Sequence, residues 1–288
     1  MNKVEVKRVY KVFGAREKEA LKLAQGGMGK DEVLRRTGCT LGLQDVTLSI
    51  PAGQVFVIMG LSGSGKSTLV RHFNGLIQAS AGEILIDGQD VTKLDARGLQ
   101  ELRRHKVSMV FQSFGLMPHK TTLENAAFAL TTRGEKREAA LEAGRAWLER
   151  VGLKGYEQKY PDELSGGMRQ RVGLARALAA NTDVLLMDEA FSALDPLIRS
   201  DMQDQLLQLQ RDLHKTIIFI THDLDEALRI GGQIAILYHG QLVQVGTPHQ
   251  ILTQPANDYV RRFVEKRAAN LEVAEANKPS AQGPAGSP

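Results

Sequence analysis

The sequence predicts an α/β fold in which a largely parallel sheet is covered on both faces. Three continuous apolar runs have the length and composition of fully buried strands: residues 54–59 (QVFVIM), 184–188 (VLLMD) and 216–221 (TIIFIT). Stretches with helical spacing lie between them; in residues 198–213, for example, apolar side chains recur every three or four positions. Strands that alternate with helices along a chain favour a parallel sheet.

The N-terminal region is expected to form a strand and a helical insert. Residues 3–13 (KVEVKRVYKVF) largely alternate between polar and apolar side chains, which is typical of a strand. Residues 15–40 have the pattern of two short helices that break at Gly26 and Gly27 and end at Gly38. Glycine suits that last position because it readily takes the left-handed conformation that closes a helix.

Further alternating runs predict the remaining strands, and the helices gather in one segment. One run contains Leu48, a second contains Ile84, and a third ends at Gln112. Two more form a hairpin around residues 239–240. From about residue 113 to residue 164 the spacing of apolar side chains becomes helical.

We expect one domain over residues 1–268. The remaining segment, residues 269–288, is rich in Pro, Gly and Ser and lacks periodicity, so we expect it to be disordered.

The composition excludes several classes of protein. No apolar run approaches the 18 or more residues of a transmembrane helix, and the single Cys39 excludes an internal disulfide framework or a multi-cysteine zinc site. The net charge of +4 arises in residues 1–40, which hold ten basic and five acidic residues. Aromatic residues make up only 5% of the chain, which argues against a basic, aromatic face for nucleic acid. We therefore expect no nucleic-acid partner.

A glycine-rich loop between a buried strand and a helix predicts a nucleotide site. Gly60-x-x-x-x-Gly65-Lys66-Ser67 fits the P-loop pattern, in which backbone N–H groups surround the β-phosphate of ATP. Lys66 would supply a mobile charge for the β- and γ-phosphates, and the Ser67 hydroxyl would bind Mg²⁺. The residues expected to contact the nucleotide are Gly60, Leu61, Ser62, Gly63, Ser64, Gly65, Lys66, Ser67 and Thr68.

Two adjacent carboxylates end the apolar run at residues 184–188. Asp188 is expected to hold Mg²⁺, usually through water, at the edge of the sheet. Glu189, next to it on the strand, is expected to point the other way, which suits a carboxylate that polarises water. In isolation this pair could simply end a strand; its occurrence in a chain that has a P-loop favours a catalytic role.

A second glycine-rich loop, LSGGMRQR at residues 164–171, also leads into a helix. It could serve another ligand, or it could be a structural turn that caps the helix. It could also be one half of a site that another copy of the chain completes. The loop by itself does not distinguish these alternatives.

Taken together, the motifs resemble the ATP-binding cassette superfamily. The P-loop, Gln112, LSGGMRQR, Asp188, SALD at residues 192–195 and His222 occur in that family's order and spacing, and the resemblance covers residues 1–265. It implies a RecA-like core of the P-loop NTPase type with a mostly parallel sheet. It also implies an antiparallel β subdomain and an inserted α-helical signature subdomain at about residues 113–164.

The resemblance also implies roles for individual residues. Phe13 would stack on adenine, with Tyr10 as the less favoured candidate. Gln112 would sense Mg²⁺ and the attacking water, Glu189 would act as the general base, and His222 would hold the γ-phosphate and water in line.

In this family the second glycine loop meets the nucleotide of the opposite subunit. Ser165 and Gly167 would contact the γ-phosphate held by the partner's P-loop, and Gly166 and Asp195 would lie in the same interface. The resemblance therefore implies a sandwich of two copies of the chain around two ATP molecules.

Longer segments resemble the ATPase subunits of bacterial importers for quaternary amines. They are VIMGLSGSGKSTLVR, FQSFGLMPHKTTLENAAFAL and THDLDEALRIGGQIAIL. The resemblance implies import of glycine betaine, proline betaine, choline, proline or histidine, driven from the cytoplasmic face of the bacterial inner membrane. Permease subunits would form the channel, and a substrate-binding protein would act indirectly.

The permease is expected to dock on residues 112–130, where Phe114, Leu116 and Met117 could receive one of its helices. Many members of the subfamily continue into a pair of CBS domains, but this sequence ends in the Pro-, Gly- and Ser-rich tail, so we expect no gating by such domains. The alternative is a soluble cassette ATPase of translation or DNA repair. Members of those groups usually carry two cassettes or long coiled coils, and neither feature fits the roughly fifty residues between Gln112 and Leu164.

Overall fold

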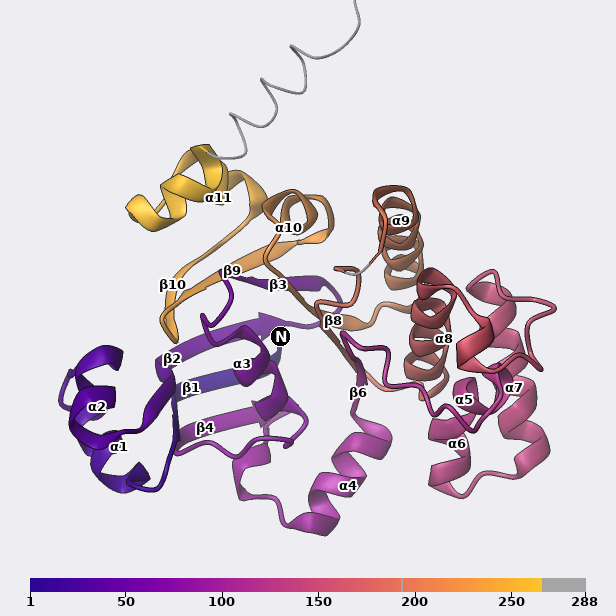
Figure 1. Cartoon of the computed structure of the whole chain (residues 1–288), viewed down its shortest axis with the longest axis horizontal. Helices are drawn as coiled ribbons and strands as arrows, with labels where there is room; N and C mark the ends of the chain where they lie inside the picture. The colour runs from indigo at the N-terminus through magenta and orange to yellow at the C-terminus, as the bar shows by residue number, and fades with distance from the viewer. Residues whose placement is uncertain (193, 266–288) are drawn as a thin grey trace, which may run out of the picture.

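The computed structural model describes residues 1–192 and 194–265, which contain two β-sheets with helices around them (Figure 1). The six-stranded sheet has the order β10-β9-β3-β8-β7-β6, and all neighbours are parallel except β9 and β10. The four-stranded sheet has the order β2-β1-β4-β5 and is antiparallel throughout. The predicted α/β fold with a mostly parallel sheet and an antiparallel subdomain is therefore confirmed.

The strands are β1 (Asn2–Phe13), β2 (Thr40–Pro51), β3 (Val55–Met59), β4 (Ala81–Ile86), β5 (Gln89–Asp90), β6 (Val107–Val110), β7 (Val184–Asp188), β8 (Thr216–Thr221), β9 (Gln233–Tyr238) and β10 (Gln241–Gly246). The α-helices are α1 (Glu17–Gln25), α2 (Lys30–Thr37), α3 (Lys66–Phe73), α4 (Ala96–His105), α5 (Thr122–Ala126), α6 (Phe128–Arg133), α7 (Arg137–Arg150), α8 (Gly166–Ala179), α9 (Pro196–Leu213), α10 (Leu224–Ile230) and α11 (Pro248–Thr253). Short 3-10 turns occupy Val91–Lys93 and Pro161–Glu163, and residues 258–265 are also helical.

The parallel sheet is buried on both faces, as its apolar strands predict. Every residue of β3 is buried, and its alternate side chains enter two different hydrophobic clusters. Val57 and Met59 pack with α8, α9 and α10, whereas Phe56 and Ile58 pack with α3 and the antiparallel sheet. Helices α5, α6 and α7 lie on the right of Figure 1, beside α8.

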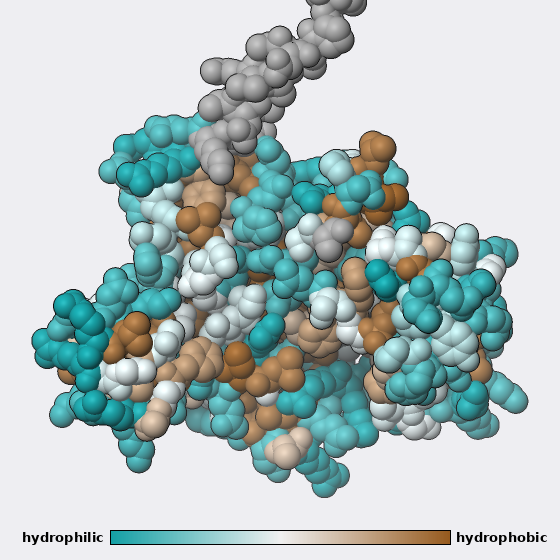
Figure 2. Space-filling view, viewed as in Figure 1, coloured by the Kyte–Doolittle hydropathy of each residue, from teal (hydrophilic) through white to brown (hydrophobic). Residues whose placement is uncertain are grey.

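The insert forms the two helices that the sequence predicts. Helices α1 and α2 enclose a small buried cluster that includes Ala20, Ala24 and Val33, and Gly38 ends α2 in the left-handed conformation. Cys39 lies in that cluster, 1% exposed, so its thiol is part of the packing. The polar surfaces of α1 and α2 face solvent at the left of Figure 2. The predicted disorder of residues 269–288 lies outside the described residues.

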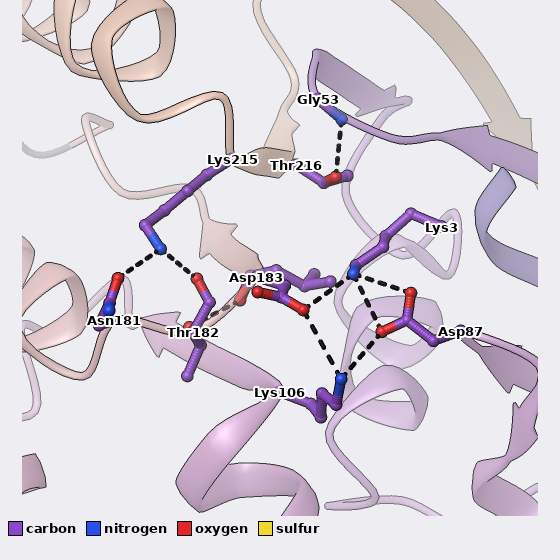
Figure 3. A network of polar contacts seen from close by, with 10 residues as sticks. Lys3, Gly53, Asp87, Lys106, Asn181, Thr182, Asp183, Lys215 and Thr216 are labelled. Atoms are coloured by element: carbon purple, nitrogen blue, oxygen red, sulfur yellow. Dashed lines mark hydrogen bonds and ion pairs between the residues drawn. The ribbon is translucent and has the colours of Figure 1, made fainter. Parts of the chain in front are cut away.

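A network of charges joins the two sheets at the amino ends of β6 and β7 (Figure 3). Lys3 Nζ of β1 donates to Asp87 at 2.9 Å and to Asp183 at 3.0 Å, and Lys106 lies 3.3 Å from Asp87. Burial acts to lower the pKa of Lys3, but the hydrogen bonds to the two carboxylates outweigh it and raise the pKa. These contacts hold the antiparallel sheet on the end of the core that lies opposite the loops of the candidate site.

In the part of the chain that the structure describes, we find no helix long and apolar enough to cross a membrane.

Candidate active site

The first glycine loop connects β3 to α3 at the carboxyl end of the parallel sheet. Gly60, Gly63 and Gly65 all have positive φ angles, of 150°, 75° and 101°. A Cβ atom on Gly60 would lie 2.3 Å from the carbonyl oxygen of Leu237, so no larger residue fits without moving the backbone. No side chain caps the amino end of α3, which leaves its N–H groups available to a phosphate.

Lys66 folds back over this loop. Its Nζ donates to the carbonyl oxygens of Gly60 at 2.8 Å and Leu61 at 3.1 Å, and it lies 3.6 Å from Glu189 Oε1. Burial lowers the pKa of Lys66, and the Glu189 carboxylate acts in the opposite direction. The ammonium group is thus held between the loop and a carboxylate, where a phosphate could replace the carbonyl oxygens.

Oxygen donors suited to Mg²⁺ lie beside the lysine. Ser67 Oγ donates to Asp188 Oδ1 at 2.8 Å, and Asp188 is only 3% exposed. A hydroxyl and a carboxylate are ligands that Mg²⁺ accepts, directly or through water. Within residues 1–192 and 194–265, no cluster of three or more His, Cys, Asp or Glu residues could hold a metal ion.

Glu189 brings together residues that follow three different strands. Its Oε2 lies 3.5 Å from Gln112 Nε2, after β6, and 3.4 Å from His222 Nδ1, after β8. The expectation that Glu189 points away from Asp188 by strand alternation is wrong. Strand β7 ends at Asp188, and Glu189 has a φ of 47°, in the left-handed region. This turn directs its carboxylate to Lys66 of the P-loop, next to the Ser67 that Asp188 contacts.

Of the two aromatic candidates for the adenine, only Phe13 is available. Its side chain is 41% exposed at the end of β1, whereas Tyr10 is 4% exposed and packs inside the insert cluster. Lys11 Nζ lies 5.2 Å from the centroid of the Phe13 ring. Gly42 makes room for the ring, since a Cβ atom there would lie 2.7 Å from it.

The second glycine loop begins α8. Ser165 Oγ accepts a hydrogen bond from Met168 N at 3.3 Å, so the serine does cap the helix. It is nevertheless exposed, and with Gly166, Gly167 and Asp195 it lines a cavity of about 470 Å³. Among the described contacts, no hydrogen bond or ion pair joins residues 164–167 to the P-loop of the same chain. Ser165 is thus accessible from solvent.

Comparison with known proteins assigns the chain to a family. A family model described as ABC transporter matches residues 43–192. The chain belongs to the ABC transporter family.

Two relatives of this ABC chain are named as ATP-binding proteins of glycine betaine transport. The "Glycine betaine/proline betaine transport system ATP-binding protein ProV" of Escherichia coli (strain K12) is 58% identical over 265 residues, which is 91% of this chain and 65% of the relative. The "Glycine betaine transport ATP-binding protein OpuAA" of Bacillus subtilis (strain 168) is 55% identical over 267 residues, with 91% and 63% covered. The chain thus spans just under two thirds of the length of these relatives.

Solved structures place the fold among the ABC cassettes. The dimeric post-hydrolysis structure of the ATP-binding cassette MJ0796, bound to ADP and Pi, matches with a TM-score of 0.73 and 31% identity. The match covers 85% of this chain and 98% of that chain. The predicted cassette family and fold are confirmed, and so is the resemblance to quaternary-amine importer subunits. The roles of individual residues stay predictions.

The structure adds to this ABC site a residue that no sequence motif indicates. The hydroxyl of Tyr259 accepts a hydrogen bond from the N–H of Leu61 at 3.3 Å and lies 3.5 Å from the carbonyl oxygen of Leu237. Its ring stacks on Tyr238 with a centroid distance of 4.0 Å. Tyr259 thereby attaches the helix at residues 258–265 to the P-loop, from almost 200 positions further along the chain.

Arg71 is a second such residue. Its guanidinium lies 3.5 Å from Asp188 Oδ2, one helical turn beyond Ser67. A basic residue at this position of a P-loop helix carries no recognisable sequence signal of its own.

Proposed function

We propose that the chain binds ATP with Mg²⁺ on residues 60–68 and hydrolyses it. The observation that carries this proposal is the approach of Lys66, Gln112 and His222 to one carboxylate, that of Glu189. Phe13 would stack on the adenine, and Ser67, Asp188 and Gln112 would face the ion. Mg²⁺, when bound, would neutralise charge on the phosphate oxygens.

In this mechanism a water molecule attacks the γ-phosphorus of ATP, and the bond from that phosphorus to the β–γ bridging oxygen breaks. The proton of the water passes to Glu189, and ADP and inorganic phosphate leave. His222, 3.4 Å from the same carboxylate oxygen, orients the water and the γ-phosphate. Lys66 stabilises the negative charge that spreads over the transferred group.

Two copies of the chain would form two shared sites. Ser165, Gly166, Gly167 and Asp195 would complete the site on the partner's P-loop. The exposure of this loop supports the proposal, and the similar MJ0796 cassette was solved as a dimer. ATP bound between the copies would hold them together until it is hydrolysed.

The cellular role that we propose is to energise a membrane importer of quaternary amines or related amino acids, such as glycine betaine, proline betaine, choline, proline or histidine. The support is 58% identity over 91% of the chain to a subunit whose name states glycine betaine/proline betaine transport. The chain would act at the cytoplasmic face of the bacterial inner membrane, with permease subunits and, indirectly, a substrate-binding protein. A role in translation or DNA repair is not favoured by any of these relatives.

An apolar cavity supports a docking site for the permease. It has a volume of about 610 Å³ and lies between α4, β6, α6 and α8, lined by Met109, Phe111, Met117 and Phe128 among others. Of the three residues expected to receive the permease, only Met117 lines it. Phe114 packs under Arg169, 5.3 Å from its guanidinium carbon, and Leu116 packs against the main core.

Uptake measurements test this function. A strain that lacks the chain should lose uptake of radiolabelled glycine betaine or choline, and the wild-type gene should restore it, whereas a Lys66→Ala copy should not. The wild-type chain should also co-purify with a membrane permease. Unchanged uptake of all five candidate solutes, or ATPase activity that nucleic acid stimulates without any permease, would overturn the importer role.

A further inference from the structure

Arg199, in the first turn of α9, contacts two loops that approach the candidate site from different sides. Its Nη2 donates to the carbonyl oxygen of Leu194 at 3.1 Å and lies 3.4 Å from that of Ser192. Its Nη1 lies 3.6 Å from Asp223 Oδ2. The Arg199 side chain is only 30% exposed, so these interactions are partly shielded from solvent.

The first of these loops begins on the candidate base. Ser192 N and Ser192 Oγ both donate to the carbonyl oxygen of Glu189, at 3.1 Å and 2.8 Å. Of the two carbonyl groups that Arg199 contacts, that of Ser192 therefore belongs to the turn that begins at Glu189, and that of Leu194 lies two residues further along the same loop.

The second loop carries His222. Asp223 follows this histidine directly, and its Oδ1 caps α10 by accepting from Asp225 N at 2.9 Å and Glu226 N at 3.3 Å. Asp223 N in turn donates to Thr221 Oγ1 at 3.0 Å. Asp223 is thus hydrogen-bonded through both its backbone N–H and its carboxylate, and it is the residue next to His222. A contact on the Asp223 carboxylate can therefore influence the position of His222.

One turn further along α9, a buried contact joins the same segments. Gln203 Nε2 donates to Glu226 Oε1 at 2.9 Å, and both residues are buried. Burial raises the pKa of Glu226, while hydrogen bonds from Thr221 and Gln203 act against this. Helix α9 is therefore bonded to the segment that follows His222. Arg199, on the same helix, also contacts the loop that follows Glu189.

We propose that Arg199 is a positioning residue that keeps the side chains of Glu189 and His222 in the relative positions that hydrolysis requires. An arginine suits this role because its planar group donates in several fixed directions and always carries its charge. Lysine would reach one loop but could not donate to both with the same geometry. The inference rests on the proposed hydrolysis of ATP, not on the identity of the transported solute.

The test compares four variants with the wild type for kcat, KM and nucleotide affinity. Arg199→Ala removes the link, and Arg199→Lys keeps only the charge. Asp223→Asn keeps an oxygen that can cap α10 but removes the charge that Arg199 faces. Arg229→Ala is the matched control, because Arg229 joins the same two helices through Asp204, at 2.8 Å, without contacting either loop.

We expect Arg199→Ala to lower kcat at least about tenfold relative to Arg229→Ala, with nucleotide affinity within about twofold, because Arg199 contacts none of residues 60–68. Arg199→Lys should recover less than half of the loss. Asp223→Asn should also lower kcat, and the double variant Arg199→Ala/Asp223→Asn should be no slower than Arg199→Ala alone.

A kcat for Arg199→Ala within about twofold of the Arg229→Ala control would overturn the proposal, as would fully additive losses in the double variant. An equal loss of nucleotide affinity would do the same, because it would indicate general damage to the site. If Arg199→Ala does not fold, as judged by thermal unfolding, Arg199→Lys and Asp223→Asn decide the question. Absence of hydrolysis by the wild-type chain would instead contradict the proposed function.

Discussion

Replacing Glu189 by glutamine removes one negative charge and keeps the shape of the side chain. Glu189 is the only residue placed to contact Lys66, Gln112 and His222 at once among the described contacts, and its Oε2 alone faces the last two. The neighbouring carboxylate, that of Asp188, accepts a hydrogen bond from Ser67 and is expected to face Mg²⁺, so it is not placed to take the proton of the attacking water. The loss should therefore approach the full contribution of a general base.

The expected fall in kcat is about 100- to 10,000-fold. That range corresponds to about 2.7 to 5.4 kcal/mol in activation free energy, at 1.36 kcal/mol for each factor of ten. Binding of ATP should persist or become tighter, because the amino end of α3 and Lys66 are unchanged and a negative charge close to the phosphates has gone. An ATP-bound dimer should therefore accumulate.

Phosphate release measures the turnover, and size-exclusion chromatography with Mg²⁺ and ATP measures the dimer. Glu149→Gln is a suitable control, because Glu149 is exposed on α7 and, among the described residues, forms an ion pair only with Lys154, at 2.6 Å. Hydrolysis by Glu189→Gln within about threefold of this control would refute the assignment of Glu189 as the base.

Other predictions follow from the same site and from the charge network. Lys66→Ala should weaken ATP affinity at least about tenfold, since a charge that is otherwise buried against the P-loop is lost; unchanged affinity in a fluorescent-nucleotide titration would contradict the P-loop assignment. Mixing inactive Lys66→Ala and Ser165→Ala chains should restore about a quarter of the wild-type activity, because half of the dimers are mixed and each has one intact site; no recovery in proven heterodimers would exclude sites shared between chains. The hydrogen bond from Lys3 lowers the pKa of Asp183, so this carboxylate stabilises the fold above its unfolded pKa of about 3.9 and ceases to do so as the pH falls through the lower folded value. Asp183→Asn should therefore reduce the free energy of unfolding by at most about 1 kcal/mol at pH 7, since Asp183 is 51% exposed. The reduction should be smaller at pH 3. A difference between variant and wild type that grows on acidification in denaturant titrations would be inconsistent with this.

Much of the fold follows from local patterns in the chain. The apolar runs at β3, β7 and β8 are strands because they are long enough and apolar enough to be buried on both faces. The break between α1 and α2 follows from adjacent glycines. The order of strands in the sheet, with β3 between β8 and β9, depends on pairing between segments far apart in sequence, and no local pattern specifies it.

Some features of the candidate site likewise follow from local sequence, whereas others depend on how the elements pack. The sequence by itself determined which residues form the P-loop and that Asp188 ends a buried strand, because those features depend on neighbours in the chain. The family resemblance already favours Phe13 over Tyr10, and the packing of α1 and α2 against β1 supplies a separate physical reason, because it leaves Phe13 exposed and buries Tyr10.

Only the tertiary structure decided the direction of Glu189, the bond of Tyr259 to the P-loop, and the contacts of Arg199 with two loops. Glu189 leaves the strand through a left-handed turn, so the two-residue period of a strand does not apply to it. Tyr259 and Arg199 contact groups that lie near them only after the sheets and helices have packed. Periodicity reports which side of an element is buried, whereas these contacts depend on where the elements meet.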